Sequence, residues 1–294
     1  MKPAPVDFVA AGSLQEAVDL LAANDEAKVL AGGQSLIPLL NFRLASPELL
    51  VDINRIPDLN VVGERDGGVV MGATVRQATA LQSELLGRMC PLVCAGLARV
   101  GHPQIRSRGT VVGSLTHHDP AAEMPAVAVA LGARMVIQSA RGRRTVDAED
   151  FFISHYSTDT SPDEVVVEAW FPAAPPGTGA AFLELARRHG DFALVGVAAQ
   201  VTLDAGVVSD ARVAAIGVGE RPVRCRGTED ILIGNALTNE SVLAAAAVAA
   251  HEPGIHPADD IHATAEYRLE MVPLLVERAV QEAAEKARAA TPLR

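Results

Sequence analysis

The 294-residue chain has few cysteines and few aromatic residues, and each shortage excludes a class of protein. Its three cysteines, Cys90, Cys94 and Cys225, form an odd and low number that argues against a disulfide-stabilised scaffold. They are also too few for iron–sulfur clusters, which are held by sets of thiolates. Aromatic residues make up only 3% of the chain, so the core must be built mainly from small aliphatic side chains.

Positive charge and long apolar runs are scarce as well. The formal net charge is −11, and basic residues occur in short pairs such as Arg143-Arg144, so nucleic acid is not an expected partner. An acidic surface still permits an anionic cofactor, because backbone N–H groups can hold phosphate. The sequence contains no apolar stretch long enough to span a membrane and no signal peptide, which predicts a cytoplasmic location.

The remaining pattern predicts a mixed α/β protein of two or three units. Hydrophobic residues make up 49% of the chain, enough for a sizeable core. Ser13 and Glu16 form a capping box that should begin a helix. Short apolar runs at residues 28–31 and 49–53 predict buried strands in the first unit.

A second unit is predicted from about residue 57, and a third after the Pro- and Gly-rich segment at residues 172–179. Asp66-Gly67-Gly68 predicts a hairpin in the second unit. Helices are expected there at residues 75–81, 85–100 and 121–131, with an irregular stretch at 102–119. The third unit is expected to hold strands at residues 181–187, 194–203 and 207–218, and then helices at 241–250 and 262–289.

Ala31-Gly32-Gly33-Gln34-Ser35 lies between a predicted strand and a predicted helix. Paired glycines allow positive φ and a close approach of the backbone to a ligand. Successive amides can then form a nest for phosphate oxygens, to which Ser35 adds a hydroxyl and the helix start adds its dipole. An ordinary Gly-Gly turn with Ser35 as helix N-cap is the alternative, and the segment alone does not decide between them.

A second segment, residues 106–114, gathers arginines, glycines and hydroxyl side chains and continues to Pro120 and Glu123. Long irregular segments inside a compact domain are often functional, and a ribose or pyrophosphate needs short donors of this kind. The alternative is a plain surface loop. Neither segment matches the dinucleotide fingerprint or the Walker loop.

Two further clusters are interpreted as structural. His117-His118-Asp119 invites a metal site, but neighbouring residues on an extended chain point to opposite sides, so no metal is expected. Cys90 and Cys94 are expected to be buried thiols on one face of a helix. Glu184 and Asp191 are isolated in the sequence and are also expected to be structural. The sequence offers no recognisable catalytic acid, base or nucleophile.

Taken together, the two glycine-containing segments resemble the FAD-binding medium subunits of the carbon monoxide dehydrogenase and xanthine dehydrogenase family, the molybdenum hydroxylases. Residues 28–40 resemble the family's loop around the FAD pyrophosphate, and residues 102–114 resemble its second FAD loop. Residues 187–193 and 260–268 resemble segments of its C-terminal domain. The similarity covers nearly the whole chain, and motifs in this order and spacing are specific.

The resemblance implies an α/β (α+β) fold. The expected architecture is a vanillyl-alcohol-oxidase (PCMH)-type FAD-binding domain of two subdomains, followed by a C-terminal domain with a three-stranded antiparallel sheet and helices. FAD-binding subdomain 1 would span residues 1–56 and subdomain 2 residues 57–176. The C-terminal domain, like that of the carbon monoxide dehydrogenase flavoprotein, would span residues 177–294.

The resemblance also implies which residues contact FAD. The residues expected around the pyrophosphate are Ala31, Gly32, Gly33, Gln34, Ser35 and Leu36. The rest of the site would be lined by Thr110, Gly113, Ser114, His117 and Glu123, with Glu123 near the ribose or adenine. Val167 would lie beside the isoalloxazine and Phe192 would cover that ring. Val112 stands where the family usually has glycine, and Glu123 stands where the family often has aspartate.

The resemblance implies an oxidoreductase subunit with neither a catalytic residue nor a metal site of its own. A substrate, possibly an N-heterocycle or carbon monoxide, would be oxidised on a large molybdopterin subunit. Electrons would cross the 2Fe–2S clusters of a small subunit, reach FAD here and leave to an external acceptor. The expected assembly is a heterohexamer of two heterotrimers. The alternatives are a stand-alone flavin-dependent oxidase of the same fold and a non-catalytic assembly protein, against which the intact glycine loops argue.

Overall fold

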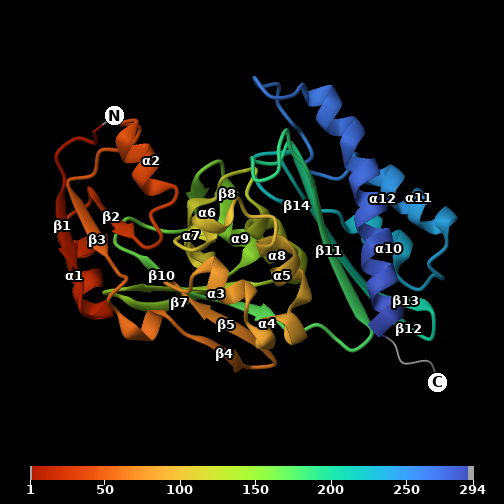
Figure 1. Ribbon diagram of the computed structural model, residues 1–294, viewed down its shortest axis with the longest axis horizontal. Helices are drawn as coiled ribbons and strands as arrows, with labels where there is room; N and C mark the ends of the chain where they lie inside the picture. The colour runs from red at the N-terminus through yellow and green to blue at the C-terminus, as the bar shows by residue number, and fades with distance from the viewer. Residues whose placement is uncertain (1, 291–294) are drawn as a thin grey trace.

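The computed structural model describes residues 2–290 and arranges them around three main sheets along its long axis (Figure 1). The first sheet is parallel, with the order β1 (Asp7–Ala10), β3 (Leu49–Asp52), β2 (Ala27–Leu30). Helix α1 (Leu14–Ala23) connects β1 to β2, and α2 (Leu36–Asn41) follows β2. Because the strands are parallel, their carboxyl ends meet at one edge, where ligands bind in many open α/β sheets.

The predicted capping box at the start of α1 is confirmed with one change. The Ser13 hydroxyl accepts a hydrogen bond from the Glu16 amide at 3.1 Å. The Glu16 carboxylate, however, accepts from the Gly12 amide at 2.7 Å, one residue before the cap. The first bond satisfies a donor that the helix start leaves without an intrahelical partner, and the second ties the preceding residue to the first turn.

The second sheet is antiparallel, in the order β4 (Val62–Arg65), β5 (Gly68–Gly72), β10 (Val165–Pro172), β6 (Arg134–Ser139), β7 (Gly142–Asp147). The hairpin predicted at Asp66-Gly67-Gly68 is confirmed as the β4–β5 turn. A 3₁₀ turn, η1 (Pro57–Leu59), leads into this sheet. The register of β10 against β6 shifts between Val166 and Glu168, which places Val167 at a bulge.

A cluster of helices packs on the second sheet: α3 (Gln77–Leu81), α4 (Glu84–Met89), α5 (Pro91–Leu97), α6 (Pro103–Arg106), α7 (Val111–His117), α8 (Glu123–Leu131) and α9 (Ala148–Phe151). The single helix predicted at residues 85–100 is wrong, because Pro91 lacks an N–H and starts a new helix. Cys90 therefore lies at the junction as the N-cap of α5, and not on a shared helix face with Cys94. Cys90 and Cys225 are buried, Cys94 is half-buried, and all of them are free thiols.

The irregular stretch predicted at residues 102–119 is also wrong, since it contains α6 and α7. The signal that was overlooked is Thr110, whose hydroxyl accepts a hydrogen bond from the Gly113 amide at 3.0 Å and caps α7. Val111, Val112 and Leu115 then point into the core. Val112, which stands where the family usually has glycine, thus fills buried space in the core and does not narrow a loop. A short hairpin, β8 (Phe152–Ser154) with β9 (Ser157–Thr158), packs beside α7.

The third sheet holds the long antiparallel strands that were predicted: β11 (Thr178–Leu185), β12 (Val195–Asp204) and β13 (Val207–Ile216). A two-residue strand, β14 (Val223–Arg224), pairs with β13 and makes the sheet four-stranded. The short α10 (Arg226–Leu232) was not predicted. It packs with α11 (Asn239–Ala249) and α12 (Ala265–Ala290) on one face of the sheet.

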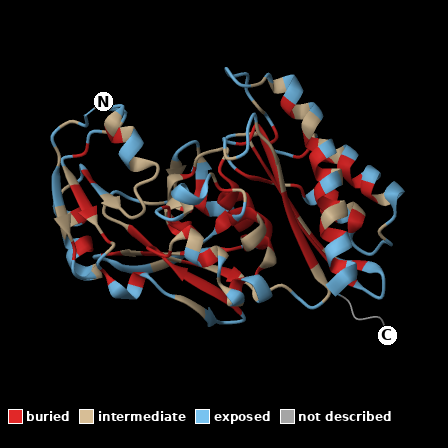
Figure 2. Cartoon of the chain, in the orientation of Figure 1, coloured by how far each residue is buried: buried red, intermediate tan, exposed pale blue. Residues whose placement is uncertain are grey.

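The third sheet has two buried faces, as Figure 2 shows. Alternate residues of β12 face opposite sides: Val197 and Ala199 join the core under α12, whereas Ala198 joins the core around α8. Every residue of α8 is buried. This helix therefore connects the second and third sheets into one packed body. No helix among residues 2–290 is long and apolar enough to cross a bilayer.

Candidate functional site

The two glycine-containing segments lie against each other, backbone on backbone. A Cβ atom at Gly32 would lie 2.6 Å from the Arg108 carbonyl oxygen, 2.8 Å from Gly109 Cα and 2.9 Å from the Thr110 nitrogen. Real Cβ atoms do not approach backbone this closely, so glycine is required at residue 32. The fold thus brings together the two segments that sequence analysis had singled out separately.

The first of these segments presents a run of free amide donors. Gly33 has φ +72°, a left-handed conformation that turns the chain back toward α2. Within residues 2–290, the backbone N–H groups of residues 32–36 donate no hydrogen bond to any acceptor, and these residues are only half-buried. Ser35 occupies the N-cap position of α2, yet its hydroxyl makes no capping bond. The geometry is that of an anion-binding nest, not of a turn capped by Ser35.

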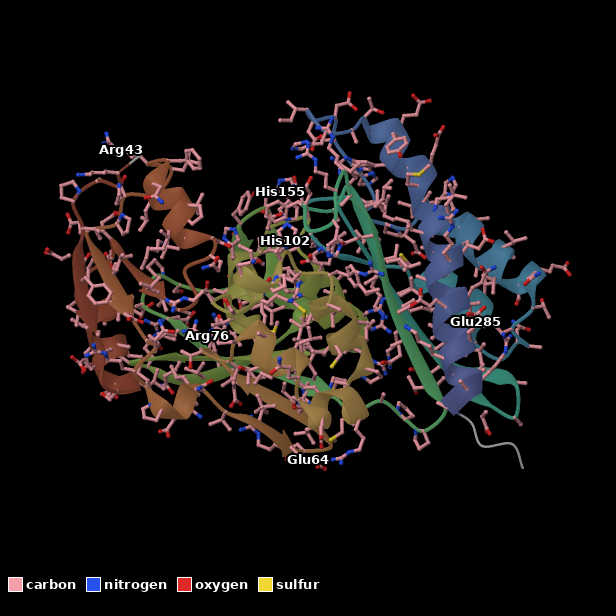
Figure 3. All side chains as sticks on the ribbon, in the orientation of Figure 1. Arg43, Glu64, Arg76, His102, His155 and Glu285 are labelled. Carbon is pink, nitrogen blue, oxygen red and sulfur yellow. The ribbon has the colours of Figure 1, made fainter. Side chains whose placement is uncertain are left out.

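A polar bridge under the two loops was missed by sequence analysis. Asn54 donates from Nδ2 to the Ala31 carbonyl at 2.8 Å, and its Oδ1 accepts from Arg76 Nη2 at 2.6 Å. Arg76 Nη1 also donates to the Arg108 carbonyl at 2.5 Å. Burial, and then the nearby Arg108, lower the pKa of Arg76. Figure 3 shows Arg76 between the first sheet and the central helices.

The only sequence signal for Asn54 was its place just after β3, at the carboxyl edge of the first sheet. Arg76 had no local signal, because its partners are distant in sequence. These two side chains hold the first loop at a set position relative to the second.

The start of α7 supplies the second wall of the site. Thr110 is buried, and its hydroxyl oxygen accepts the bond that caps α7, so it orients this helix while its O–H remains able to donate. Ser114 lies one turn into the helix, half-buried, and its hydroxyl has no hydrogen-bond partner within the described residues. Both hydroxyls therefore keep an O–H that can donate to a ligand, and that of the half-buried Ser114 is the more accessible.

His117 and His118 point into different environments, as expected for neighbouring residues. The His117 ring lies 5.2 Å from that of Tyr156, and burial lowers the pKa of this histidine. His118 has φ +47°, ends α7 and is fully buried, with Nδ1 3.0 Å from the Ser157 carbonyl. Within residues 2–290, no cluster of His, Cys, Asp and Glu side chains has the geometry to hold a metal ion.

Glu123 begins α8 and is 8% exposed. Burial, with the negative charge of Glu184 as a smaller contribution, raises its pKa to about 8. Burial likewise raises the pKa of Glu184 to about 7, and one of its carboxylate oxygens has no partner among the described residues. The interpretation of Glu184 as an isolated carboxylate is therefore wrong, because β11 packs beside α5, α5 packs on α8, and the charge of Glu184 acts on Glu123.

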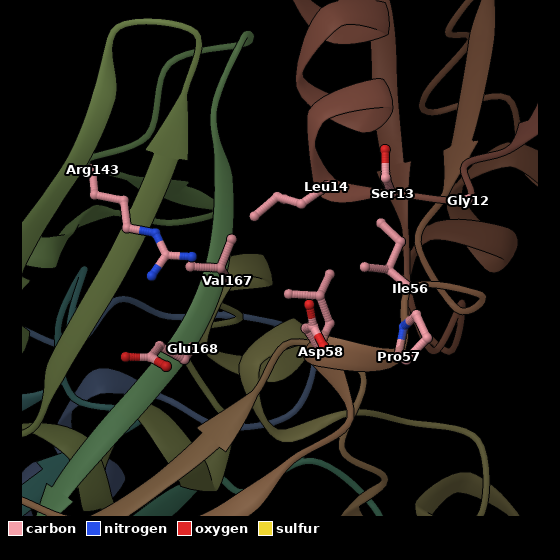
Figure 4. Close-up of a pocket in the computed structure, with 10 residues that line it drawn as sticks. Gly12, Ser13, Leu14, Ile56, Pro57, Asp58, Arg143, Val167 and Glu168 are labelled. Carbon is pink, nitrogen blue, oxygen red and sulfur yellow. The ribbon is translucent and has the colours of Figure 1, made fainter.

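Val167 and Phe192 line different cavities. Val167 lies in a cavity of about 180 Å³ between the start of α1 and the second sheet, with Leu14, Ile56 and Arg143 among the lining residues (Figure 4). Phe192 is 69% exposed and lines a larger cavity of about 750 Å³ beside the C-terminal sheet. The structure thus does not bring together these two residues, which the resemblance placed at one ring.

The C-terminal motif at residues 187–193 packs on the second loop. Gly190 has φ +85° and lies so close to the His102 ring that any side chain there would collide with it. The His102 and His189 rings lie 6.1 Å apart. Segments from all three sheets therefore converge around one region, which begins at the free amides and extends to Phe192.

Known proteins share both the sequence and this arrangement. Residues 4–174 match the family model described as FAD binding domain in molybdopterin dehydrogenase, and residues 180–283 match the CO dehydrogenase flavoprotein C-terminal domain. The chain is 43% identical to the 6-hydroxypseudooxynicotine dehydrogenase complex subunit alpha of Paenarthrobacter nicotinovorans, over 98% of this chain and 97% of the relative. It is 38% identical to the carbon monoxide dehydrogenase medium chain of Hydrogenophaga pseudoflava, over 96% and 98%.

Solved structures agree with these sequence matches. Carbon monoxide dehydrogenase from Hydrogenophaga pseudoflava superimposes with a TM-score of 0.94 at 38% identity, covering 97% of this chain and 99% of that one. Quinoline 2-oxidoreductase from Pseudomonas putida 86 gives 0.93 at 36% identity, covering 98% and 99%. The fold and the loops define a FAD-binding oxidoreductase subunit. More particularly, the chain belongs to the family of FAD-binding medium subunits of molybdenum-dependent dehydrogenases, which confirms the resemblance and the fold class.

Proposed function

We propose that this chain holds FAD between residues 31–36 and the start of α7 and serves as an electron relay. Electrons released where a partner's molybdopterin centre oxidises the substrate would pass through 2Fe–2S clusters of a second partner and leave here to an external acceptor. FAD, when bound, supplies the ability to take up electrons singly or in pairs and to pass them on. The observation that carries the proposal is the run of free amides at residues 32–36, pressed against the second loop.

The residues present fit FAD. The amides of residues 32–36 would hold the pyrophosphate without side-chain cations, which suits a chain of net charge −11. The hydroxyls of Ser35 and Ser114 are free to donate to the phosphate or sugar oxygens. Gln34, Leu36, His117 and Glu123 remain predicted contacts. Phe192 lines the larger cavity, which supports its place over the isoalloxazine, and Val167, in the smaller cavity, remains a predicted contact.

The partners are proposed from whole-length similarity to chains named as subunits of complexes. A small iron–sulfur subunit and a large molybdopterin subunit would complete a heterohexamer of two heterotrimers. The substrate class that similar chains support is an N-heterocycle, as in the nicotine and caffeine enzymes, or carbon monoxide. The proposal also divides the chain into three units, with boundaries at residues 56/57 and 176/177. The three main sheets support this division, because each unit contains one of them.

The first test is the visible absorption spectrum of the purified chain, followed by heat release and chromatography of any bound chromophore. We expect bound FAD and no other flavin. A colourless chain that also rejects added FAD would remove the relay and favour the assembly protein. Oxidation of small alcohols or amines by the isolated flavoprotein would favour the stand-alone oxidase. Iron–sulfur and molybdopterin chains that co-purify from the native source would support the proposed complex.

Asn54→Ala is expected to weaken FAD binding roughly tenfold, since it removes the hydrogen bonds that tie the Ala31 carbonyl to Arg76. The measurement is a titration of the FAD-free chain with FAD, followed by flavin fluorescence. Asn60→Ala is the control, because Asn60 is exposed and its side chain makes no hydrogen bond within residues 2–290. Equal affinities in the two variants would show that the bridge does not position the loop.

A further inference from the structure

The residue proposed to cover the isoalloxazine does not fix its own position. Phe192 is 69% exposed, so little of its side chain packs on the described residues. It lies in the connection between β11 and β12, residues 186–193. Where the two strands meet this connection, the Leu194 amide donates to the Leu185 carbonyl at 2.7 Å. The place of the Phe192 ring must therefore come from the backbone of the connection.

That backbone folds into a tight turn just before Phe192. The Asp191 amide donates to the Arg188 carbonyl at 3.1 Å and closes a four-residue turn. Gly190, the third residue of the turn, has φ +85°, which is typical of a type II turn. Gly190, Asp191 and Phe192 all line the larger cavity. Because Phe192 follows the turn directly, any movement of the turn would displace its ring.

The His102 ring packs on this turn from the FAD-binding domain. A Cβ atom at Gly190 would lie 2.4 Å from Cε1, 2.7 Å from Nδ1 and 2.9 Å from Nε2 of His102, so one edge of the ring rests on the glycine. The His102 side chain makes no hydrogen bond within residues 2–290, so the interaction is van der Waals contact. The His189 ring lies 6.1 Å from that of His102, tilted by 59°.

His102 itself is held by a rigid backbone. It is the N-cap of α6, and its carbonyl accepts from the amides of Ile105 at 2.9 Å and Arg106 at 3.1 Å. Arg106 Nη1 then donates to the carbonyls of Val100 at 2.7 Å and Gly101 at 2.9 Å. The residues before and after His102 are thus tied together, and Figure 3 shows His102 among the central helices.

We propose that His102 is a positioning residue that holds Phe192 over the isoalloxazine. The segment that carries His102 continues into residues 108–110, which pack on Gly32 in the first loop. The same rigid segment therefore contacts the loop for the pyrophosphate at one end and the turn before Phe192 at the other. The inference rests on the proposed function, because it assigns His102 a role only if FAD binds here.

The first test is amide hydrogen exchange of the FAD-free chain, measured for peptides that cover residues 186–194. His102→Ala is expected to make exchange in this segment roughly fivefold faster, because the turn loses the ring that rests on it. His102 is exposed, so the substitution leaves the core intact. His251→Ala is the matched control, since His251 is also exposed, lies just after α11 and is no part of the turn.

The second test is a double-mutant cycle in the FAD-bound chain. His102→Ala and Phe192→Ala are each expected to weaken FAD binding roughly fivefold, and the double variant no more than Phe192→Ala alone. Independent roles would instead multiply the losses to roughly 25-fold. The visible circular dichroism of the bound flavin reports the surroundings of the ring, and it should change in the same way in all three variants.

Unchanged exchange in His102→Ala would overturn the inference and leave the proposed function intact. Losses of affinity that multiply in the double variant would also overturn it, since His102 would then act without Phe192. A parent chain that never binds FAD would refute the proposed function and, with it, the role of Phe192. The exchange measurement separates these failures, because it needs no FAD.

Discussion

Gly33→Val is expected to yield a folded chain that retains no FAD, with the affinity lowered at least ~100-fold, or about 2.7 kcal/mol. Gly33 has φ +72°, and a β-branched residue is strongly disfavoured there. Its Cβ would also lie 3.1 Å from Ile37 Cγ1 and 3.3 Å from Leu30 Cδ1. The backbone would therefore rotate and turn the amides of residues 32–36 away from a bound pyrophosphate. The measurement is FAD per chain, with circular dichroism to report the fold.

Gly67→Val is the matched control for this variant. Gly67 has φ +69° in the β4–β5 turn, and no described atom beyond its two chain neighbours lies within 4 Å of its Cβ position. A valine at residue 67 imposes the same kind of backbone strain without touching the loop at residues 31–36, so FAD should stay bound. Normal FAD content in Gly33→Val would refute the role of the loop. Loss of FAD in both variants would attribute the effect to general destabilisation.

The FAD-free chain is expected to lose stability as pH rises from about 4.5 to about 8, opposite to the usual behaviour of a paired carboxylate. Burial raises the pKa of Glu123 from 4.5 to about 8, so in this range the folded chain holds a proton that the unfolded chain releases. The stabilisation is fully present below the pKa that Glu123 has in the unfolded chain. It is lost as pH rises through the pKa that Glu123 has in the folded chain. Its upper limit is about 5 kcal/mol, at 1.36 kcal/mol for each pKa unit.

Urea unfolding at about pH 5 and about pH 8 measures this effect. Glu123→Gln should remove most of the difference between the two free energies of unfolding, because the amide does not titrate. Glu26→Gln, at an exposed residue, should leave the difference unchanged. If Glu123→Gln behaves like that control, another group is responsible for the pH dependence. Glu184→Gln should reduce the difference by less, since the pKa of Glu184 is raised only to about 7.

Local signals in the sequence predicted elements that form locally. The capping box at Ser13, the β4–β5 turn and the long strands of the third sheet were predicted because neighbouring residues determine them. Strand β7 was missed because its sequence, Gly142–Asp147, is polar and pairs only along one edge of a sheet. Strand β1 and helix α10 are short, and packing against distant partners stabilises them.

The wrong predictions between residues 85 and 119 have the same origin. Pro91 divides a hydrophobic run that suggested one helix, and the side chains of α7 alternate between the core and the site. The glycine and serine of that helix are weak helix formers, so the segment looked irregular, although a Cβ at Gly113 would lie only 2.5 Å from the Thr110 hydroxyl oxygen that caps the helix. Thr110, which caps α7, was the local signal that could have corrected this prediction.

The sequence by itself determined the free amides of residues 32–36, since paired glycines and the left-handed turn at Gly33 depend on backbone sterics alone. It also determined the resemblance that led to FAD. Only the tertiary structure decided that Asn54 and Arg76 tie the two loops, that the charge of Glu184 acts on Glu123, and that the His102 ring packs on Gly190. Each of these features depends on contacts between residues far apart in the chain, and such contacts leave no local pattern to read.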